Sequence, residues 1–224
     1  MEEGLILYSY WRSSAAYRVR IALNLLGLAH EIRPVHLVQD GGQQHAADYA
    51  ALNPQELVPT LVDGRRVYTQ SLAIMEYLNE RYAHDLRLLP EDTRERARER
   101  ALAQIVACDI HPLGNLRVLQ YLERELDAAD EARRGWSRHW IELGFRALEA
   151  QLADHPETGA FCQGDTPGLA DACLVPQVYN AHRWGVDMGA YPTIARINER
   201  CVALEAFQRA SPEQQPDAPT TSER

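Results

Sequence analysis

Segments with the patterning of β-strands occur only in the early part of this chain. Residues 5–8 form a short apolar run, and residues 31–38 form another after an amphipathic helical segment at residues 15–26. A strand, a helix and a second strand in this order predict a parallel pair joined by a right-handed crossover. The chain is therefore expected to begin with a small β-α-β unit.

A hairpin and one further helix follow this unit. Leu61-Val62 and Val67-Tyr68 flank Asp63-Gly64, a dipeptide that suits the type I′ turn of a two-residue hairpin. A second amphipathic helical pattern begins at Ser71 and places its apolar residues on one side. The resulting order, βαβ followed by ββα, predicts a complete α/β domain over residues 1–83.

Only helical periodicity is present in the rest of the chain. Residues 84–91 contain Leu-Leu-Pro and are predicted to form a linker, and residues 92–210 are predicted to form an all-helical bundle. Pro112 lacks an N–H group, so the first of these helices should be kinked or broken there. Residues 211–224 are polar and rich in proline, which is typical of disordered segments. The predicted fold class is therefore an α/β domain followed by an all-α domain.

Composition excludes several classes of protein. The formal net charge of −9 argues against a nucleic-acid partner, because binding of phosphates needs a basic surface. No apolar run approaches the roughly 20 residues of a membrane helix, and the acidic N-terminus lacks the pattern of a signal peptide. The four cysteines fit no zinc-binding spacing, so no metal is expected. We therefore expect a cytoplasmic protein without membrane or nucleic-acid partners.

The chain contains no lysine, so all 23 residues counted as lysine or arginine are arginines. This bias is best explained by genomic base composition, but it still limits the available chemistry. Any anion site must use arginine, histidine or backbone N–H groups, and no amine is available for a Schiff base. Arg18 and Arg20 lie past the first turn of the first predicted helix, and we expect them to make structural or subunit-interface salt bridges.

Ser13 and Ser14 stand at the predicted start of the first helix. The first N–H groups of a helix have no partners within it, and either serine could simply cap them. The same N–H groups and the helix dipole also attract an anion and lower the pKa of a thiol placed there. No cysteine lies in this region, so a reactive thiol would have to arrive with a cofactor.

Two further segments could hold such a cofactor. A cis peptide bond between Val58 and Pro59 would leave the backbone of Val58 free to pair with an extended peptide-like ligand. Gln70 and Ser71 begin the second helix, where Ser71 is either a cap or a contact for a carboxylate. Two helix starts beside one free backbone edge suit a small anionic peptide.

Six segments of the chain, taken in order, resemble the zeta class of the glutathione transferase superfamily. They are SSAAYRVRIAL, DGGQQ, ALNPQELVPTL, QSLAI, DIHPLGNLRVL and GDTPGLADACLVPQV, and they extend over nearly the whole length. The resemblance implies a thioredoxin-like glutathione-binding domain, a helical substrate-binding domain and a homodimer. It also implies the zeta-class activity, which is glutathione-dependent cis–trans isomerisation of maleylacetoacetate in the catabolism of tyrosine and related aromatic compounds.

The resemblance further implies roles for individual residues in binding reduced glutathione. Ser13, with Ser14 beside it, matches the serine that hydrogen-bonds the glutathione sulfur, so these serines are the expected catalytic groups. The other matching residues are Gln44 at the glycine end, Val58 before Pro59 at the cysteinyl backbone, Gln70 and Ser71 at the γ-glutamyl end, and His111 and Asn115 in the helical domain.

The chain departs from the zeta-class pattern at two positions. Ala15 stands where the signature has cysteine, so the reactive sulfur cannot come from that position. Gly168 stands where a serine or threonine usually forms a capping box with Asp171, which leaves only the return hydrogen bond from Asp171. Because glycine at an N-cap costs little relative to serine, we expect the fold to survive.

The implied substrate is a small dicarboxylate keto acid, which requires cations near the bound thiol. Arg12, Arg183 and Arg117 are the candidates, each with a structural alternative. Arg12 could instead pack its stem on Trp11. Arg183 could complement the dipole at a helix C-terminus, and Arg117 could belong to a solvated helix face. His111 is expected to hydrogen-bond glutathione or substrate in preference to carrying a proton.

Three other functions stay open. Maleylpyruvate isomerisation in the gentisate pathway uses the same chemistry on a substrate with a different keto-acid arm. A thiolate at Ser13 would also support conjugation or dehalogenation of small electrophiles. A glutathione-fold interaction module without catalysis is the third, but the intact Ser13, Gln70 and Ser71 argue against it.

Overall fold

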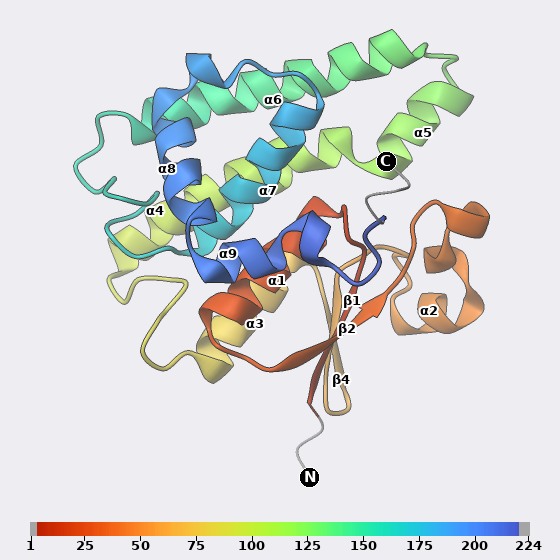
Figure 1. The fold of residues 1–224 in the computed structure, drawn as a ribbon, viewed down its shortest axis with the longest axis horizontal. Coiled ribbons are helices and arrows are strands. Elements are labelled where there is room, and N and C mark those ends of the chain that lie inside the picture. The colour runs from red at the N-terminus through yellow and green to blue at the C-terminus, as the bar shows by residue number, and fades with distance from the viewer. Residues whose placement is uncertain (1–3, 220–224) are drawn as a thin grey trace. The chain divides into compact units, whose positions relative to one another are not determined.

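The computed structural model of this chain describes residues 4–219, which fold into two compact units (Figure 1). The first unit contains the described residues up to Leu88 together with those from Leu204 onward, and the second contains Leu89–Ala203. Among residues 4–219, no helix combines the length and the apolar character that crossing a membrane requires.

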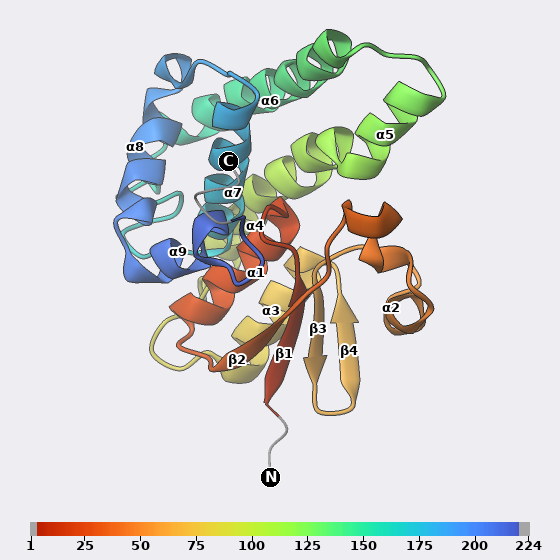
Figure 2. The same ribbon diagram turned by 45° about the vertical axis from the view of Figure 1, so that its right-hand side comes forward.

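A four-stranded mixed sheet forms the centre of the first unit (Figure 2). Its strands are β1 (Leu5–Ser9), β2 (His30–Pro34), β3 (Thr60–Asp63) and β4 (Arg66–Thr69). They lie in the order β2-β1-β3-β4, with β1 parallel to β2 and antiparallel to β3, and β3 antiparallel to β4. Leu7 in the central strand pairs with Leu61 of β3, and both side chains are 0% exposed. The predicted βαβ–ββα order is confirmed.

Three helices accompany this sheet: α1 (Ser14–Leu25), α2 (Ala47–Leu52) and α3 (Ser71–Tyr82). α1 and α3 pack against each other on one side of the strands, and α2 lies on the other side (Figure 2). The apolar face predicted for α1 is buried. Gly27 follows this helix with a φ of 66°, the left-handed conformation in which glycine commonly ends a helix.

β2 is shorter than the sequence predicts. It ends at Pro34, whereas the apolar pattern extends to Val38. Pro34 has no N–H group to continue a ladder of hydrogen bonds. The chain then turns through two short 3-10 segments, η1 (Gln39–Gly41) and η2 (Gln43–His45), before α2.

The last described part of the chain belongs to the first unit. α9 (Glu205–Ala210) packs beside α1 and is followed by the 3-10 turn η6 (Pro212–Gln214) (Figure 1). Phe207 is completely buried, and Gln215 is 8% exposed. The side-chain amide of Asn24 in α1 donates to the carbonyl oxygen of Ala206, which fastens the two helices together.

This arrangement differs from the predicted domain boundaries. The sequence predicts a helical domain over residues 92–210 and a disordered tail over residues 211–224, whereas residues 204–219 are folded onto the first unit. Polar, proline-rich composition disfavours long helices, but it does not prevent short turns from docking on a distant helix. Residues 220–224 lie outside the described part of the chain.

The second unit is helical, as predicted. Pro112 breaks its first helix: a π-helical turn at Ile105–Ile110 is followed by a 3-10 turn at His111–Gly114. The proline ring occupies the start of that 3-10 turn, where its missing N–H group costs nothing. The longer helices of the unit are α4 (Thr93–Gln104), α5 (Leu116–Arg124), α6 (Asp130–Leu152), α7 (Leu169–Arg183) and α8 (Pro192–Val202).

Glu99 of α4 supplies the cap that Gly168 cannot provide for α7. Glu99 Oε1 accepts a hydrogen bond of 2.7 Å from the N–H of Ala170, in the first turn of α7. Asp171 Oδ2 accepts the N–H of Gly168 at 2.9 Å, which is the return hydrogen bond of the capping box. The carboxyl group of Glu99, from a different helix, therefore takes the place of the usual serine or threonine, and Asp171 keeps its ordinary part in the capping box.

Both carboxyl groups are buried, and this affects their protonation. Desolvation, reinforced by the charge of Asp171, raises the pKa of Glu99 to about 8 from an ordinary value of 4.5. Glu99 Oε2 has no hydrogen-bond partner among the described residues. Since the folded state holds this proton more tightly than the unfolded state, Glu99 stabilises the fold fully below about pH 4.5. This contribution is lost as the pH rises to about 8.

We predict that Glu99→Ala lowers the free energy of unfolding by about 1–3 kcal/mol, because the buried N–H of Ala170 loses its acceptor. Adding Gly168→Ser to this variant should recover part of the loss, since a serine N-cap accepts from the same turn. Denaturant unfolding of the single and double variants measures both effects. No recovery in the double variant would show that Glu99 does not act as the cap.

Glu99→Gln tests the proton on this side chain separately. The amide resembles the protonated carboxyl group but does not titrate. In the parent protein, Glu99 makes stability fall between about pH 5 and about pH 8, and this fall should be absent from the variant. Denaturant unfolding across this range is the measurement. A pH dependence equal to that of the parent protein would mean that Glu99 is ionised in the folded state at neutral pH.

Candidate active site

The pairing of three strands brings several predicted site residues to one end of the sheet. Tyr8 of β1 pairs with Thr60 of β3, and Thr60 pairs with Thr69 of β4. The chain enters or leaves the sheet next to each of these residues. The adjoining segments contain Ser13, Val58 with Pro59, and Gln70 with Ser71.

Ser13 is the N-cap of α1, and Ser14 is the first residue of that helix. Ser13 Oγ accepts a hydrogen bond of 3.2 Å from the N–H of Ala16. The capping bond uses a lone pair of the oxygen, so the hydroxyl proton is still available for donation. Ser13 therefore caps the helix, as one of the two alternatives from the sequence predicted, and its hydroxyl proton can still be donated to an anion.

The peptide bond between Val58 and Pro59 is cis, as predicted. Val58 is 8% exposed. Hydrogen bonds to the backbone carbonyl group of the preceding residue, Leu57, hold this segment in place. The oxygen of Leu57 accepts hydrogen bonds from Tyr49 Oη at 2.6 Å and from Asn53 Nδ2 at 2.8 Å. Within residues 4–219, no hydrogen bond engages the backbone N–H or C=O of Val58, so this edge can pair with a peptide-like ligand.

Gln70 and Ser71 form the start of α3. Gln70 has a φ of 69°, a left-handed conformation that is strained for a residue with a side chain. Ser71 is 7% exposed, and its Oγ accepts a hydrogen bond of 3.2 Å from Arg18 Nη1. The hydroxyl proton of Ser71 and the first N–H groups of α3 can then be donated to a carboxylate.

Gln44 is buried in the turn η2, beyond the end of β2. Its Nε2 lies 3.4 Å from the carbonyl oxygen of Leu37 and 3.0 Å from His45 Nε2. The Oε1 atom is buried and has no hydrogen-bond partner among the described residues. An unsatisfied buried acceptor is costly for a fold, which favours a ligand N–H as its partner.

The helix starts give this end of the sheet a positive potential. Neither α1 nor α3 has an acidic residue in its first turn. The N–H groups and the dipoles of both helices therefore act on an anion without opposition from a carboxylate in either first turn. Arg12, just before Ser13, lies with its guanidinium carbon 5.4 Å from the centre of the Trp11 ring. This contact is the structural alternative expected for Arg12 from the sequence, in which its side chain packs on Trp11.

Of the two roles expected for Arg18 and Arg20, the structure supports the structural one, since both side chains make hydrogen bonds inside the first unit. They are 2% and 1% exposed, so they lie inside the first unit and not on a surface available to a second subunit. Arg18 connects α1 to Ser71, a role that the sequence did not suggest. The sequence did contain a signal of this burial: Arg18 lies four residues before Ala22, and therefore on the apolar face of the helix.

The remaining predicted residues lie in the second unit. His111 begins the 3-10 turn His111–Gly114, which contains Pro112. Asn115 caps α5, because its Oδ1 accepts the N–H of Arg117 at 3.2 Å, and Arg117 itself is exposed. Arg183 is in the last turn of α7, with its guanidinium carbon 4.8 Å from the centre of the Trp184 ring.

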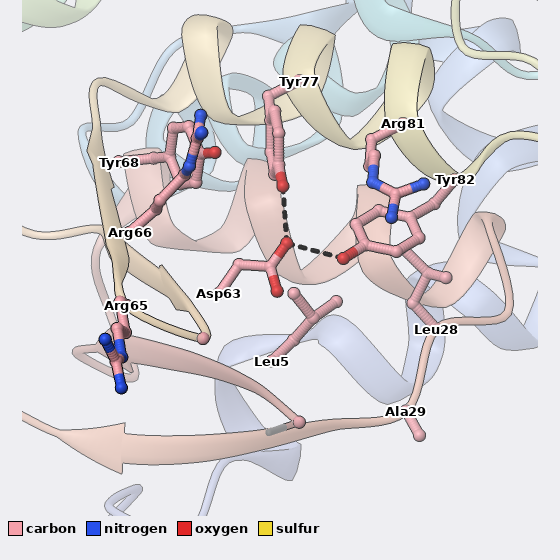
Figure 3. A pocket seen from close by; sticks show the side chains of 12 residues that line it. Leu5, Leu28, Ala29, Asp63, Arg65, Arg66, Tyr68, Tyr77, Arg81 and Tyr82 are labelled. Carbon is pink, nitrogen blue, oxygen red and sulfur yellow. Dashed lines mark hydrogen bonds between the residues drawn. The ribbon is translucent and has the colours of Figure 1, made fainter. Parts of the chain in front are cut away.

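A cavity of about 730 Å³ lies at the opposite end of the sheet in the first unit (Figure 3). Asp63 Oδ2 accepts hydrogen bonds of 2.5 Å from the hydroxyls of both Tyr77 and Tyr82. Tyr68 stacks on Tyr77 with a ring separation of 4.0 Å. These contacts fasten the β3–β4 hairpin to the far end of α3, and none of the predicted site residues lines this cavity.

Comparison with known proteins agrees with the fold. Residues 12–81 match the family described as "Glutathione S-transferase, N-terminal domain". The "Probable maleylacetoacetate isomerase" of Vibrio cholerae serotype O1 is 55% identical over 215 residues, covering 96% of this chain and 99% of that protein. The "Maleylpyruvate isomerase" of a Ralstonia species is 49% identical over 213 residues, covering 95% and 99%.

Two solved structures extend the comparison. The holo structure of maleyl pyruvate isomerase, described as a bacterial glutathione-S-transferase in zeta class, has a TM-score of 0.92 and 47% identity, covering 96% of this chain and 100% of that one. Maleylacetoacetate isomerase from Anaeromyxobacter dehalogenans 2CP-1, with dicarboxyethyl glutathione and citrate in its active site, has a TM-score of 0.85 and 44% identity. This match covers 99% of this chain and 96% of that one.

The fold is that of a glutathione transferase. The relatives are similar over almost the full length of both chains. The chain belongs to the zeta-class family of glutathione transferases, which contains the maleylacetoacetate and maleylpyruvate isomerases. The resemblance found in the sequence is thereby confirmed.

We predict that Gln70→Gly raises thermal stability and weakens glutathione binding at the same time. Glycine adopts a φ of 69° without the steric cost, which should stabilise the fold by about 1 kcal/mol. Loss of the carboxamide should raise the KM for glutathione. Thermal unfolding and steady-state kinetics measure the two effects.

Gln55→Ala is the matched control, because Gln70 Nε2 donates to Gln55 Oε1 at 2.7 Å. This variant removes the side-chain hydrogen bond but leaves the backbone of Gln70 unchanged. It should not raise thermal stability. A melting temperature of Gln70→Gly at or below that of the parent protein would contradict the assignment of strain to this residue.

Proposed function

We propose that this chain is a glutathione-dependent cis–trans isomerase that converts maleylacetoacetate to fumarylacetoacetate. The observation that carries this proposal is the start of α1, where Ser13 caps the helix through its oxygen and keeps a hydroxyl proton to donate. A donor at a helix N-terminus stabilises a thiolate. The extensive similarity to maleylacetoacetate isomerases supports the same conclusion.

The polar groups of the first unit suit reduced glutathione. We assign Ser13, with Ser14 beside it, to the sulfur, since both lie at the start of α1. The unpaired backbone of Val58 suits the amide groups of the cysteinyl residue. The remaining assignments are Gln70 and Ser71 at the start of α3 for the γ-glutamyl end, and Gln44 with its unsatisfied Oε1 for the glycine end.

When bound, glutathione supplies a thiolate that adds reversibly to the conjugated double bond of the substrate and so permits rotation about that bond. The residues of this chain keep the sulfur ionised and in place. Ser13 donates its hydroxyl proton to the sulfur, and the first N–H groups of α1 lower the pKa of the thiol further. Both interactions favour the anion, so they lower the barrier to addition at neutral pH.

Three of the protein's four thiols are poorly suited to this chemistry, and the fourth, the exposed Cys108, lies in the π-helical turn at Ile105–Ile110 of the second unit and not beside Ser13 in the sequence. Cys162, Cys173 and Cys201 are buried in the second unit. Burial, reinforced by the negative charge of Asp171, raises the pKa of both Cys162 and Cys201. Ala15 provides no thiol beside Ser13. The nucleophile is therefore expected to come with glutathione.

The carboxylates of the substrate require cationic partners. We propose that Arg12, Arg183 and Arg117 provide them, in decreasing order of expected contribution. Arg12 adjoins the sulfur site in the sequence and presents a guanidinium that stacks on Trp11. His111 and Asn115, both in the second unit, are proposed to hydrogen-bond glutathione or the substrate.

Maleylpyruvate isomerisation is the nearest alternative, supported by the similarity to the maleylpyruvate isomerase of Ralstonia. The two substrates carry the same reacting double bond and differ in the keto-acid arm. General transfer of glutathione to small electrophiles is a broader alternative. It is supported by the dicarboxyethyl glutathione bound in the relative from Anaeromyxobacter dehalogenans.

We also propose that the protein is a cytoplasmic homodimer, as the family resemblance implies. Interfaces of normal size hold such dimers together at micromolar concentration. Sedimentation equilibrium at micromolar concentration should therefore give about twice the chain mass of 25.4 kDa. A monomer under these conditions would contradict the proposed dimer but not the proposed reaction.

The substrate assay tests the proposed function directly. Maleylacetoacetate and maleylpyruvate, presented separately, should each lose the cis isomer only when glutathione is present, and maleylacetoacetate should have the higher kcat/KM. A higher value for maleylpyruvate would favour the alternative function. Absence of glutathione-dependent turnover of either substrate would refute the isomerase proposal.

Ser13→Ala should raise the pKa of the glutathione thiol bound to the enzyme and lower kcat by roughly tenfold or more at neutral pH. Removing the hydroxyl leaves the fold nearly intact, because loss of an N-cap costs about 1 kcal/mol. Ser14→Ala is the matched control and should have the smaller effect. An unchanged thiol pKa in Ser13→Ala would reject Ser13 as the partner of the sulfur.

Arg12→Ala and Arg183→Ala should raise the KM for the diacid several-fold more than the KM for a neutral electrophile. The reason is that a guanidinium stabilises the bound carboxylates, which a neutral electrophile lacks. Steady-state kinetics with both substrates separates these effects from general damage to the site. Equal changes with the two substrates would remove both arginines as carboxylate partners.

A further inference from the structure

The loop that leads to Ser13 is held by a segment from the other end of the chain. The β1–α1 loop (residues 10–13) connects the sheet to the first helix. The C-terminal segment (residues 204–219) contains α9 and η6, and it lies beside α1 in the same unit (Figure 1). Two charged side chains, Arg20 and Asp217, make the contact between the loop and the segment.

Arg20 binds both of these elements from the middle of α1. Its Nε donates to the carbonyl oxygen of Ala210 at 2.9 Å. Its Nη1 donates to the carbonyl oxygen of Tyr10 at 3.3 Å, and its Nη2 donates to that of Trp11 at 3.1 Å. The guanidinium is rigid and planar, so it fixes these three carbonyl groups relative to one another.

Asp217 completes the contact from the C-terminal segment. Its Oδ2 accepts the N–H of Trp11 at 2.9 Å, so both backbone polar groups of Trp11 are engaged. Burial lowers the pKa of Arg20 to about 10, and the neighbouring Tyr17 and Asp217 oppose this lowering. Arg20 is consequently cationic at neutral pH, and Asp217 provides part of the compensating charge.

The same hydrogen bonds extend to Ser13. The carbonyl oxygen of Tyr10 accepts the N–H of Ser13 at 2.9 Å as well as the bond from Arg20. A shift of Tyr10 would therefore move the backbone of Ser13, and with it the hydroxyl that faces the sulfur. Displacements of this kind, well under the length of a bond, reduce the effect of a catalytic donor substantially.

We propose that Arg20 and Asp217 are positioning residues for the thiol site, which hold the β1–α1 loop so that the Ser13 hydroxyl reaches the sulfur. This inference rests on the proposed function, because it takes Ser13 as the partner of the glutathione sulfur. The C-terminal segment then contributes to the glutathione site by holding the β1–α1 loop in position. The two residues act through the loop and do not touch the ligand.

Asp217→Ala tests this proposal, with Glu205→Gln as the matched control. Glu205 is an exposed carboxylate of the same segment, in the first turn of α9. The measurements are the thiol pKa of bound glutathione, kcat and the KM for a diacid substrate. Asp217→Ala should raise the thiol pKa and lower kcat about fivefold, the effect of one hydrogen bond of about 1 kcal/mol. Glu205→Gln should leave both quantities unchanged.

Asp217→Asn provides a second test of the positioning role, because the side-chain oxygen of asparagine can still accept the N–H of Trp11. It should recover most of the kcat lost in Asp217→Ala, with a thiol pKa between those of Asp217→Ala and the parent protein. If Asp217→Ala does not fold, an Asp217→Asn variant with the parental thiol pKa overturns the proposal. A folded Asp217→Ala that is less stable but has an unchanged thiol pKa also overturns it, because that result indicates a purely structural contact.

Ser13→Ala, measured in parallel, separates this inference from the proposed function. If Ser13→Ala leaves the thiol pKa unchanged, the assignment of Ser13 to the sulfur fails and the positioning role fails with it. If Ser13→Ala raises the thiol pKa but Asp217→Ala does not, only the positioning role is overturned. Combining the two substitutions should add little to the effect of Ser13→Ala alone, since Asp217 acts through Ser13.

Discussion

The pairing of Tyr8 with Thr60 and of Thr60 with Thr69 determines where the chain leaves the sheet. Two of the adjoining segments lead into the N-termini of α1 and α3, and the third presents the unpaired backbone of Val58. An anionic peptide can therefore be bound largely by N–H groups and helix dipoles. Such a site needs few cationic side chains, which is compatible with a chain of net charge −9.

Buried ionisable side chains provide long-range connections in this fold. Arg18 donates to Ser71, and Arg20 joins the β1–α1 loop to the C-terminal segment. In the second unit, Glu99 connects α4 to the start of α7. A buried polar or charged group is costly unless hydrogen bonds replace those to water, so each of these side chains specifies its partners. Apolar contacts, which are non-directional, specify them less strictly.

The candidate site could be predicted in part, because several of its features are local. Serine before an amphipathic helix, a proline at the entrance of a strand and a polar helix start can each be recognised within a few residues. The cis peptide bond before Pro59 was predicted in this way. The availability of the Ser13 hydroxyl proton was not resolved locally, because it depends on which atom of the hydroxyl makes the capping bond.

The sequence by itself determined the βαβ–ββα order, the helical remainder with its break at Pro112, and membership of the family. These depend on periodicity and on short motifs. Only the tertiary structure decided that residues 204–219 return to the first unit and that Glu99 caps α7. The bond from Arg20 to Ala210 joins residues 190 positions apart, and that from Ala170 to Glu99 joins residues 71 apart. Periodicity and turn chemistry describe neighbouring residues, so they contain no information about such pairs.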